Sequence, residues 1–150
     1  MSETKLPERE EFSLKATWDG ATGGEVEAKG LPRLKIDTPR EFGGRGGGYC
    51  PDQLFLSSVA GCLLTTFLFF KRRLNVEVES IEVSANCSVV KTREGYRIKS
   101  VNAKIRVKAG EKQKKLVEKC LSLTKQYCHI TKTIEPVVDL NVEWEVIQLF

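Results

Sequence analysis

The sequence predicts a mixed α+β fold with the element order β-β-β-α-β-β-α-β. Three observations support this prediction. The chain begins with short segments of alternating apolar and polar residues that are separated by glycine and proline. A helical segment with no charged residue between Leu54 and Phe70 follows. The rest of the chain consists of two longer alternating segments, an amphipathic helix and a last alternating segment.

The N-terminal segments have the pattern of three short strands. Apolar residues occupy every second position over residues 12–18, which is the period of a half-buried strand. A glycine-rich turn at 19–24 leads to a second strand through residues 26–28, and a third runs through 34–36. Short strands with glycine and proline between them predict an antiparallel meander.

Residues 38–49, TPREFGGRGGGY, form a glycine-rich loop whose only cations are Arg40 and Arg45. Such a loop before a helix is a feature of phosphate sites, but the spacing here fits neither common nucleotide-binding motif. The sequence leaves two interpretations open, a flexible connector or a loop that faces a substrate.

The helix that follows begins at Pro51, a residue suited to a first helical turn. Its apolar residues fall on every side, so every side must be covered. A membrane span needs about 20 apolar residues, whereas this run is shorter and contains Ser57, Ser58, Thr65 and Thr66. The sequence therefore predicts no membrane segment but a central helix, enclosed by the rest of the chain and by a second subunit.

The next segments predict a hairpin. A long strand is expected over 76–90, with a bulge near Ser80 where the apolar phase changes. After a turn at 92–95, the return strand over 96–107 changes phase between Ile98 and Val101.

An amphipathic helix is expected from about residue 110 to Cys128, and a last strand over 138–146. Core positions are expected for Cys87, Cys120, Leu121 and Tyr127.

Length and composition limit the function. At 150 residues and a formal charge of +4, the chain suits one domain over residues 1–150 and does not call for nucleic acid. The N-terminus has no apolar export signal, so a cytoplasmic location is expected. Five cysteines there indicate redox chemistry rather than structural disulfides. A single histidine and no C-x-x-C motif predict no metal site, and no cofactor is expected.

Cys62 lies in the middle of the apolar helix, where the ordinary interpretation of a thiol is a small core residue. If it reacts, its thiolate needs a cation from elsewhere, because the helix dipole acts only near the helix ends. Arg40 and Arg45 are the candidates. Cys50, at the helix N-terminus, is a rival nucleophile, and Cys128 can meet Cys62 if the two helices pack side by side.

Asp52 precedes Cys62 by ten residues, about 15 Å along a helix. It cannot touch the sulfur, so it either holds an arginine or is an ordinary acid of the first helical turn.

Four segments together resemble the OsmC/Ohr family of osmotically inducible and organic hydroperoxide resistance proteins: TPREFGG at 38–44, PDQLF at 51–55, the AGC that ends at Cys62, and CHIT at 128–131. The resemblance extends over nearly the whole chain. It implies a β3-α-β2-α-β subunit in an intertwined, swapped homodimer whose central helices are buried.

The resemblance also implies a thiol peroxidase without a cofactor. Cys62 would be the peroxidatic cysteine, Cys128 the resolving cysteine, and Asp52 the carboxylate that holds an activating arginine. An organic hydroperoxide would be the substrate, and a dithiol such as a lipoylated protein the reductant.

This chain departs from the family pattern in several places. Asp52 stands where the family has glutamate, and the turn after the first strand, WDGATGG, lacks the arginine of one subgroup. Arg40 is preferred slightly over Arg45 as its replacement. Cys50 and His129 also differ from the usual family residues. The missing arginine motivates an alternative function, a redox sensor or a binder of small apolar electrophiles.

Overall fold

The structure is a computed structural model that describes residues 5–149. The chain divides into two compact units, Met1–Gln53 and Leu54–Phe150. Each unit is described in turn. The single domain expected over residues 1–150 stays a prediction.

The N-terminal unit contains the expected antiparallel meander. Strands β1 (Lys15–Trp18), β2 (Gly23–Glu27) and β3 (Leu34–Asp37) pair in the order β1-β2-β3. β1 begins three residues later than the alternation predicted, because Lys15 pairs with Glu27, the last residue of β2. Phe12, outside the strand, is 92% exposed.

The glycine-rich loop is organised by backbone hydrogen bonds. It starts with a 3₁₀ turn, η1 (Arg40–Phe42). The Gly46 N–H then donates to the carbonyl of Thr38 at 3.1 Å, and the Tyr49 N–H donates to that of Lys35 at 3.1 Å. Gly46 has a φ of 63°, which favours glycine there. The loop therefore folds back along β3.

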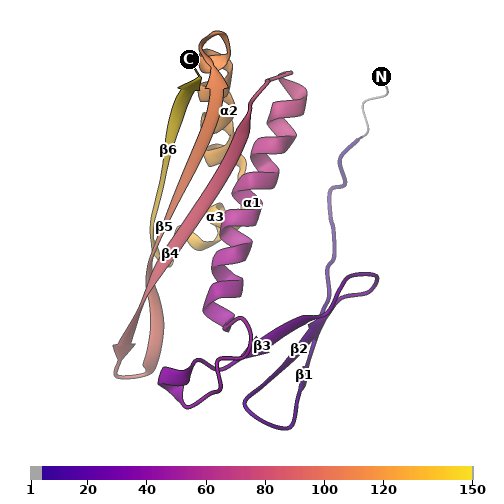
Figure 1. Ribbon diagram of the computed structural model, residues 1–150, viewed down its shortest axis with the longest axis vertical. Helices are drawn as coiled ribbons and strands as arrows, with labels where there is room; N and C mark the ends of the chain where they lie inside the picture. Colours follow the sequence, from indigo (N-terminus) through magenta and orange to yellow (C-terminus); the bar gives the residue numbers. More distant parts are fainter. Residues whose placement is uncertain (1–4, 150) are drawn as a thin grey trace. The chain divides into compact units, whose positions relative to one another are not determined.

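The C-terminal unit is built on a second sheet, with the order β4-β5-β6 (Figure 1). The long central strand β5 (Gly95–Gly110) pairs antiparallel with β4 (Ser80–Thr92) and parallel with β6 (Asp139–Leu149). Burial alternates along β5, so one face of the sheet carries the core and the other carries charged residues. The parallel pair requires the long crossover that lies between β5 and β6.

Two strand details differ from the prediction. The register of the β4–β5 pair shifts between Ser88 and Val89 of β4. This shift lies opposite residues 98–101 of β5, so the phase change expected between Ile98 and Val101 is confirmed. The expected bulge near Ser80 is wrong, because β4 only begins there.

The segment before β4 belongs instead to the end of a helix. Helix α1 (Pro51–Arg73) ends with Asn75 at a φ of 53°. The Val76 N–H donates to the Lys71 carbonyl at 2.9 Å, as in a Schellman cap. Val76 is only 2% exposed. Its apolar side chain therefore serves the helix cap and core rather than a strand.

The core of this unit lies between the sheet and the helices. α1 contributes Val59, Leu63 and Phe67, and helix α2 (Lys114–Tyr127) contributes Val117 and Leu121, all fully buried. Cys120 donates from Sγ to the Phe67 carbonyl at 3.4 Å, which links α2 to α1. The expected core positions of Cys120 and Leu121 are confirmed, whereas Tyr127 is 53% exposed and only touches the ring of Phe70.

The crossover contains a helix that the pattern did not predict, α3 (His129–Ile134), directly after α2.

Within the described residues, α1 alone has the length and apolar composition of a membrane span, and the buried core helix of a soluble protein can have the same properties. Only 22% of the most apolar 18-residue segment of α1 is buried. Much apolar surface of α1 is therefore accessible.

Candidate active site

The site begins at the N-terminus of α1. The Cys50 N–H donates to Oε1 of Gln53 at 3.0 Å, so the third helical residue reaches back to the capping residue. This bond orients the first turn, on which Asp52 lies half-buried. Asp52 and Cys62 are both on α1, ten residues and about 15 Å apart along the helix axis.

Cys62 sits halfway along α1, on its buried face. It is 9% exposed, and its helix neighbours Val59 and Leu63 are fully buried. The Thr66 hydroxyl lies 3.8 Å from the Cys62 sulfur, one turn further on. The sulfur is thus surrounded by apolar groups, with a narrow opening and one weak hydroxyl partner on its own helix.

Cys128 occupies the break between α2 and α3. Its backbone is extended, with φ −64° and ψ 108°, yet its N–H still donates to the Thr124 carbonyl at 2.9 Å. Its own carbonyl accepts from the Thr131 hydroxyl at 3.0 Å and from the Lys132 N–H at 3.1 Å. These contacts fix a fully buried side chain.

The structure brings the thiols of Cys62 and Cys128 together. Burial raises the pKa of the Cys128 thiol, and hydrogen bonds with Thr131 oppose the rise. The neighbouring Cys62 raises this pKa further, as a hydrogen-bond partner and as a negative charge. The Cys128 thiol is therefore held in its neutral form beside Cys62, and none of the five cysteines forms a disulfide.

A third group, which the sequence did not indicate as a site residue, lies beside Cys62 and Cys128. Nδ1 of His129 lies 3.6 Å from the Cys62 sulfur. His129 is the first residue of α3, and its exposed side chain connects the buried thiol to solvent. The available signal was the position of the only histidine directly after Cys128.

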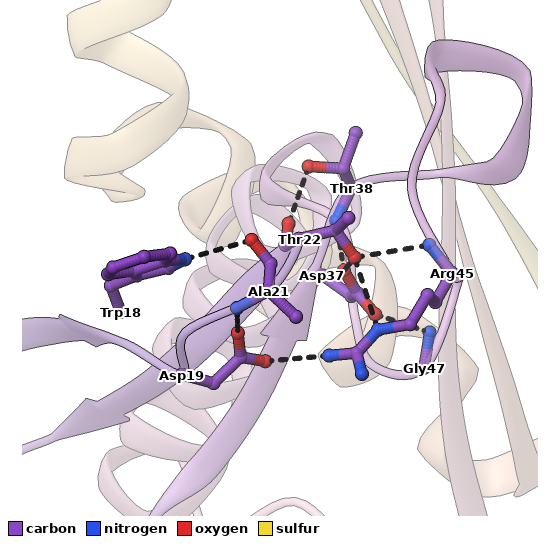
Figure 2. A network of polar contacts seen from close by, with 8 residues as sticks. All are labelled: Trp18, Asp19, Ala21, Thr22, Asp37, Thr38, Arg45 and Gly47. Carbon is purple, nitrogen blue, oxygen red and sulfur yellow. Dashed lines mark hydrogen bonds and ion pairs between the residues drawn. The ribbon is translucent and has the colours of Figure 1, made fainter.

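Both candidate arginines lie in the N-terminal unit, and Arg45 belongs to a polar network there (Figure 2). Nη2 of Arg45 lies 3.1 Å from a carboxylate oxygen of Asp19, and its Nε donates to the Thr22 hydroxyl at 3.4 Å. Arg40 Nε donates to the Arg45 carbonyl at 3.2 Å. Arg45 is therefore tied to the turn between β1 and β2, and Arg40 supports the loop that carries it.

Asp37 anchors this network. It is 3% exposed and accepts from the Thr22 hydroxyl at 2.7 Å and from the Gly47 N–H at 2.9 Å. The Thr22 hydrogen bond and that from the Gly47 backbone hold the pKa of the Asp37 carboxyl below its usual value. A charged Asp37 thus ties the β1–β2 turn to the glycine-rich loop.

The remaining thiols do not join the pair. Burial raises the pKa of Cys120 to about 11, as expected for a core thiol. Cys87 packs against the core from β4. Over residues 5–149, no group of three or more His, Cys, Asp or Glu residues is arranged to hold a metal ion.

The family model described as OsmC-like protein matches residues 44–143. Among curated proteins, the uncharacterized protein YmaD of Bacillus subtilis (strain 168) is 26% identical over 138 residues, which cover 88% of this chain and 91% of that protein.

Solved structures share the fold. The organic hydroperoxide resistance protein OsmC of Legionella pneumophila has a TM-score of 0.73 and 25% identity, covering 92% of this chain and 100% of that chain. The organic hydroperoxide resistance protein OhrB of Bacillus subtilis has a TM-score of 0.64 and 22% identity, covering 89% and 98%. The α+β prediction is confirmed by these comparisons.

Proposed function

This chain belongs to the OsmC-like protein family, and on that premise we propose that it is a thiol-dependent peroxidase that reduces organic hydroperoxides. The observation that carries the proposal is the proximity of Cys62 and Cys128. Two free thiols from different helices, one of them with access to solvent, are the groups that a peroxidatic and a resolving cysteine require.

In the proposed cycle, the Cys62 thiolate attacks the terminal oxygen of the hydroperoxide, the O–O bond breaks, and an alcohol leaves. Cys62 is then a sulfenic acid. The Cys128 sulfur attacks the Cys62 sulfur, water leaves, and a disulfide remains. A dithiol reductant, such as a lipoylated protein, takes up the oxidation by exchange and restores both thiols.

The surroundings of Cys62 favour apolar substrates. Val59 and Leu63 flank it on α1, and the nearest hydroxyl, that of Thr66, is 3.8 Å away. Hydrogen peroxide has no apolar part to bury there. An alkyl or aryl hydroperoxide gains from burial of its apolar part, so we assign organic hydroperoxides as the substrate class.

Arg45 is our candidate for the activating arginine; its carboxylate partner in this structure is Asp19, and Asp52 is the carboxylate that the resemblance implies. The resemblance placed a subgroup's arginine in the turn after the first strand, where this chain has none. Arg45 is bound to Asp19 and Thr22 of that turn, which favours it over Arg40. Arg40 then acts by supporting the Arg45 backbone.

A homodimer is part of the proposal, and so is a cytoplasmic location, which supplies dithiol reductants. Much of the apolar surface of α1 is uncovered within this chain. One of its leucines, Leu68, is 38% exposed. A second copy that covers this surface would bury apolar area and complete the surroundings of the site.

The test is intact-mass spectrometry with peptide mapping after one equivalent of cumene hydroperoxide. The proposal expects a loss of about two mass units, mapped to Cys62 and Cys128, and no such loss in Cys62→Ser. Consumption of cumene hydroperoxide should continue over many turnovers when dihydrolipoamide is present. Reduced thiols after peroxide treatment, or no consumption, would refute the peroxidase.

One observation favours a second candidate, a redox sensor. The raised pKa of Cys128 leaves little thiolate to attack a sulfenic acid, which lengthens the life of oxidised Cys62. Oxidation or adduct formation at Cys62 without turnover would select this function over the peroxidase.

A further inference from the structure

Cys62 and His129 form a pair that the family resemblance does not account for. The imidazole Nδ1 is 3.6 Å from the Cys62 sulfur, within hydrogen-bonding range for sulfur, and comes from a different helix. The Thr66 hydroxyl lies 3.8 Å from this sulfur, and Cys128 is a further hydrogen-bond partner of it. The His129 imidazole is thus nearer to the sulfur than the Thr66 hydroxyl. Of these two side chains, only the imidazole can accept a proton near neutral pH.

A thiol that is to act as a nucleophile must first lose its proton. A threonine hydroxyl is too weak a base for this transfer, and an arginine can stabilise a thiolate but cannot accept its proton. An imidazole can do both, because it becomes a cation beside the sulfur when it takes the proton. The site therefore contains a proton acceptor within its own C-terminal unit.

The local backbone holds the imidazole in place. His129 opens α3, directly after the extended residue Cys128, whose carbonyl is bound by Thr131 and Lys132. The His129 carbonyl accepts from the Thr133 hydroxyl at 2.7 Å. The segment that buries Cys128 is therefore the same segment that directs His129 to Cys62.

We propose that His129 is the catalytic base and acid for Cys62, an inference that rests on the proposed peroxidase function. Nδ1 takes the proton from the Cys62 thiol and forms a thiolate–imidazolium pair. The thiolate attacks the terminal oxygen of the hydroperoxide, and the O–O electron pair leaves with the alkoxide. The imidazolium gives its proton to that alkoxide, so a sulfenic acid and an alcohol form and His129 is neutral again.

The electrostatics of Cys62 also involve Cys128. Cys128 is the ionisable neighbour, and burial raises the pKa of its thiol, so it stays neutral beside the imidazolium. Lys125 of α2 and Lys132 of α3 are the nearest cations along the chain. With Cys128 neutral, the proton exchanged within the pair passes between Cys62 and His129.

The test compares alkylation of Cys62 by iodoacetamide from pH 5.5 to 9 in wild type, His129→Asn and His129→Ala, with modification at Cys62 quantified by peptide mapping. Asparagine retains a hydrogen-bonding group near the Nδ1 position but cannot carry the proton. Thr65→Val is the matched control, because the Thr65 hydroxyl donates to the backbone carbonyl of Cys62 at 3.3 Å. Circular dichroism and thermal unfolding confirm that each variant is folded.

Wild type is expected to react faster at pH 6.5 than an unassisted thiol would, because the imidazole takes up the thiol proton. Both His129 variants should lose about 10- to 100-fold in rate at pH 6.5 and recover with rising pH, as an unassisted thiol does. Thr65→Val should keep the wild-type profile. An unchanged profile in His129→Asn would overturn the inference.

A second measurement separates this inference from the peroxidase itself. Cumene hydroperoxide consumption with dihydrolipoamide is recorded for the same proteins. If wild type consumes peroxide and His129→Asn does so equally at pH 6.5, the peroxidase stands and the role of His129 falls. If wild type consumes none while the alkylation profiles differ as expected, the Cys62–His129 pair stands and the peroxidase falls.

Discussion

The Thr22 hydroxyl donates a 2.7 Å hydrogen bond to Asp37, a carboxylate that is only 3% exposed (Figure 2). Its pKa is lowered, chiefly by this bond, so the charged form stabilises the folded N-terminal unit. That stabilisation is present above the unfolded value of about 3.9 and is lost as the pH falls through the lower folded pKa.

We therefore expect acid to weaken the N-terminal unit mainly below about pH 4. Urea unfolding followed by Trp18 fluorescence in a Trp144→Phe background should show the decline in wild type. Thr22→Val, which removes the largest contribution to the lowered pKa of Asp37, should be less stable at neutral pH and should lose less further stability in acid. Identical pH profiles for the two proteins would contradict this role of Thr22.

The Arg45–Asp19 contact predicts which arginine matters for activity. Arg45→Ala should lower kcat/KM for cumene hydroperoxide by about 10- to 100-fold, and Arg45→Lys should recover only part of it, because lysine lacks the paired donors. Arg33→Ala, which removes two exposed ion pairs in the same unit, those with Glu25 and Glu27, is the control and should be nearly neutral. A larger loss in Arg40→Ala than in Arg45→Ala would reverse the assignment.

Cys128→Ser should trap the proposed intermediate. Without the second thiol, Cys62 can form a sulfenic acid but no disulfide, so one equivalent of peroxide adds about 16 mass units instead of removing two. Dimedone should label Cys62 when no reductant is present, and turnover with dihydrolipoamide should be slower than in wild type, because the dithiol must then attack the sulfenic acid itself. Formation of a disulfide to Cys50 in this variant would show that Cys50 resolves the intermediate.

Cys120 should be the least reactive of the described thiols. With its pKa raised to about 11 by burial, only about one thousandth of it is thiolate at pH 8. Iodoacetamide at pH 8 should label Cys50 long before Cys120 in native protein, as peptide mapping would show. Comparable labelling rates would mean that α2 opens readily from α1.

The same raised pKa has a consequence at alkaline pH. The neutral Cys120 thiol contributes stability below the unfolded pKa of about 8.5, and this is lost as the pH rises toward the folded value of about 11. Cys120→Ala should therefore flatten the alkaline decline in unfolding free energy. A decline as steep as that of wild type would assign the effect to other groups.

Leu68 provides a test of the homodimer. Leu68→Asp places a charge on the exposed apolar surface of α1 and should convert a dimer to monomer in light scattering. Leu116→Asp is the matched control, because Leu116 is also 38% exposed but lies on α2. Dimers that persist in Leu68→Asp would place the contact surface elsewhere.

The sequence predicted the elements where period and turn residues agree, and it was wrong where backbone pairing decides. Phe12 fits the alternation of a strand, but the pairing of β1 with β2 starts only at Lys15, opposite Glu27. No residue of β2 therefore lies opposite Phe12. Val76 also fits the alternation of a strand, but its N–H donates to the Lys71 carbonyl in the cap of α1. Neither outcome is visible in apolar spacing, because each depends on which backbone groups already have partners.

The candidate site was predicted in part for the same reason. Cys62 and Cys128 were singled out from the sequence, and the structure brings them together. His129 was not, because its approach to Cys62 depends on the break in the helix at Cys128, which no glycine or proline marks. Local patterns identify elements, whereas the meeting of side chains from two helices follows from packing.

The parallel pairing of β5 with β6 also has a consequence for the order of folding. β4 and β5 are joined by a tight turn and can pair early, whereas β6 reaches β5 only after the whole connection containing α2 and α3 has been ordered. Cys128 and His129 lie in that connection, and Cys62 does not. We therefore expect the reactive pair to assemble among the last steps, so that a partly folded chain exposes an unassisted Cys62 and peroxide reactivity is gained only on completion of the native state.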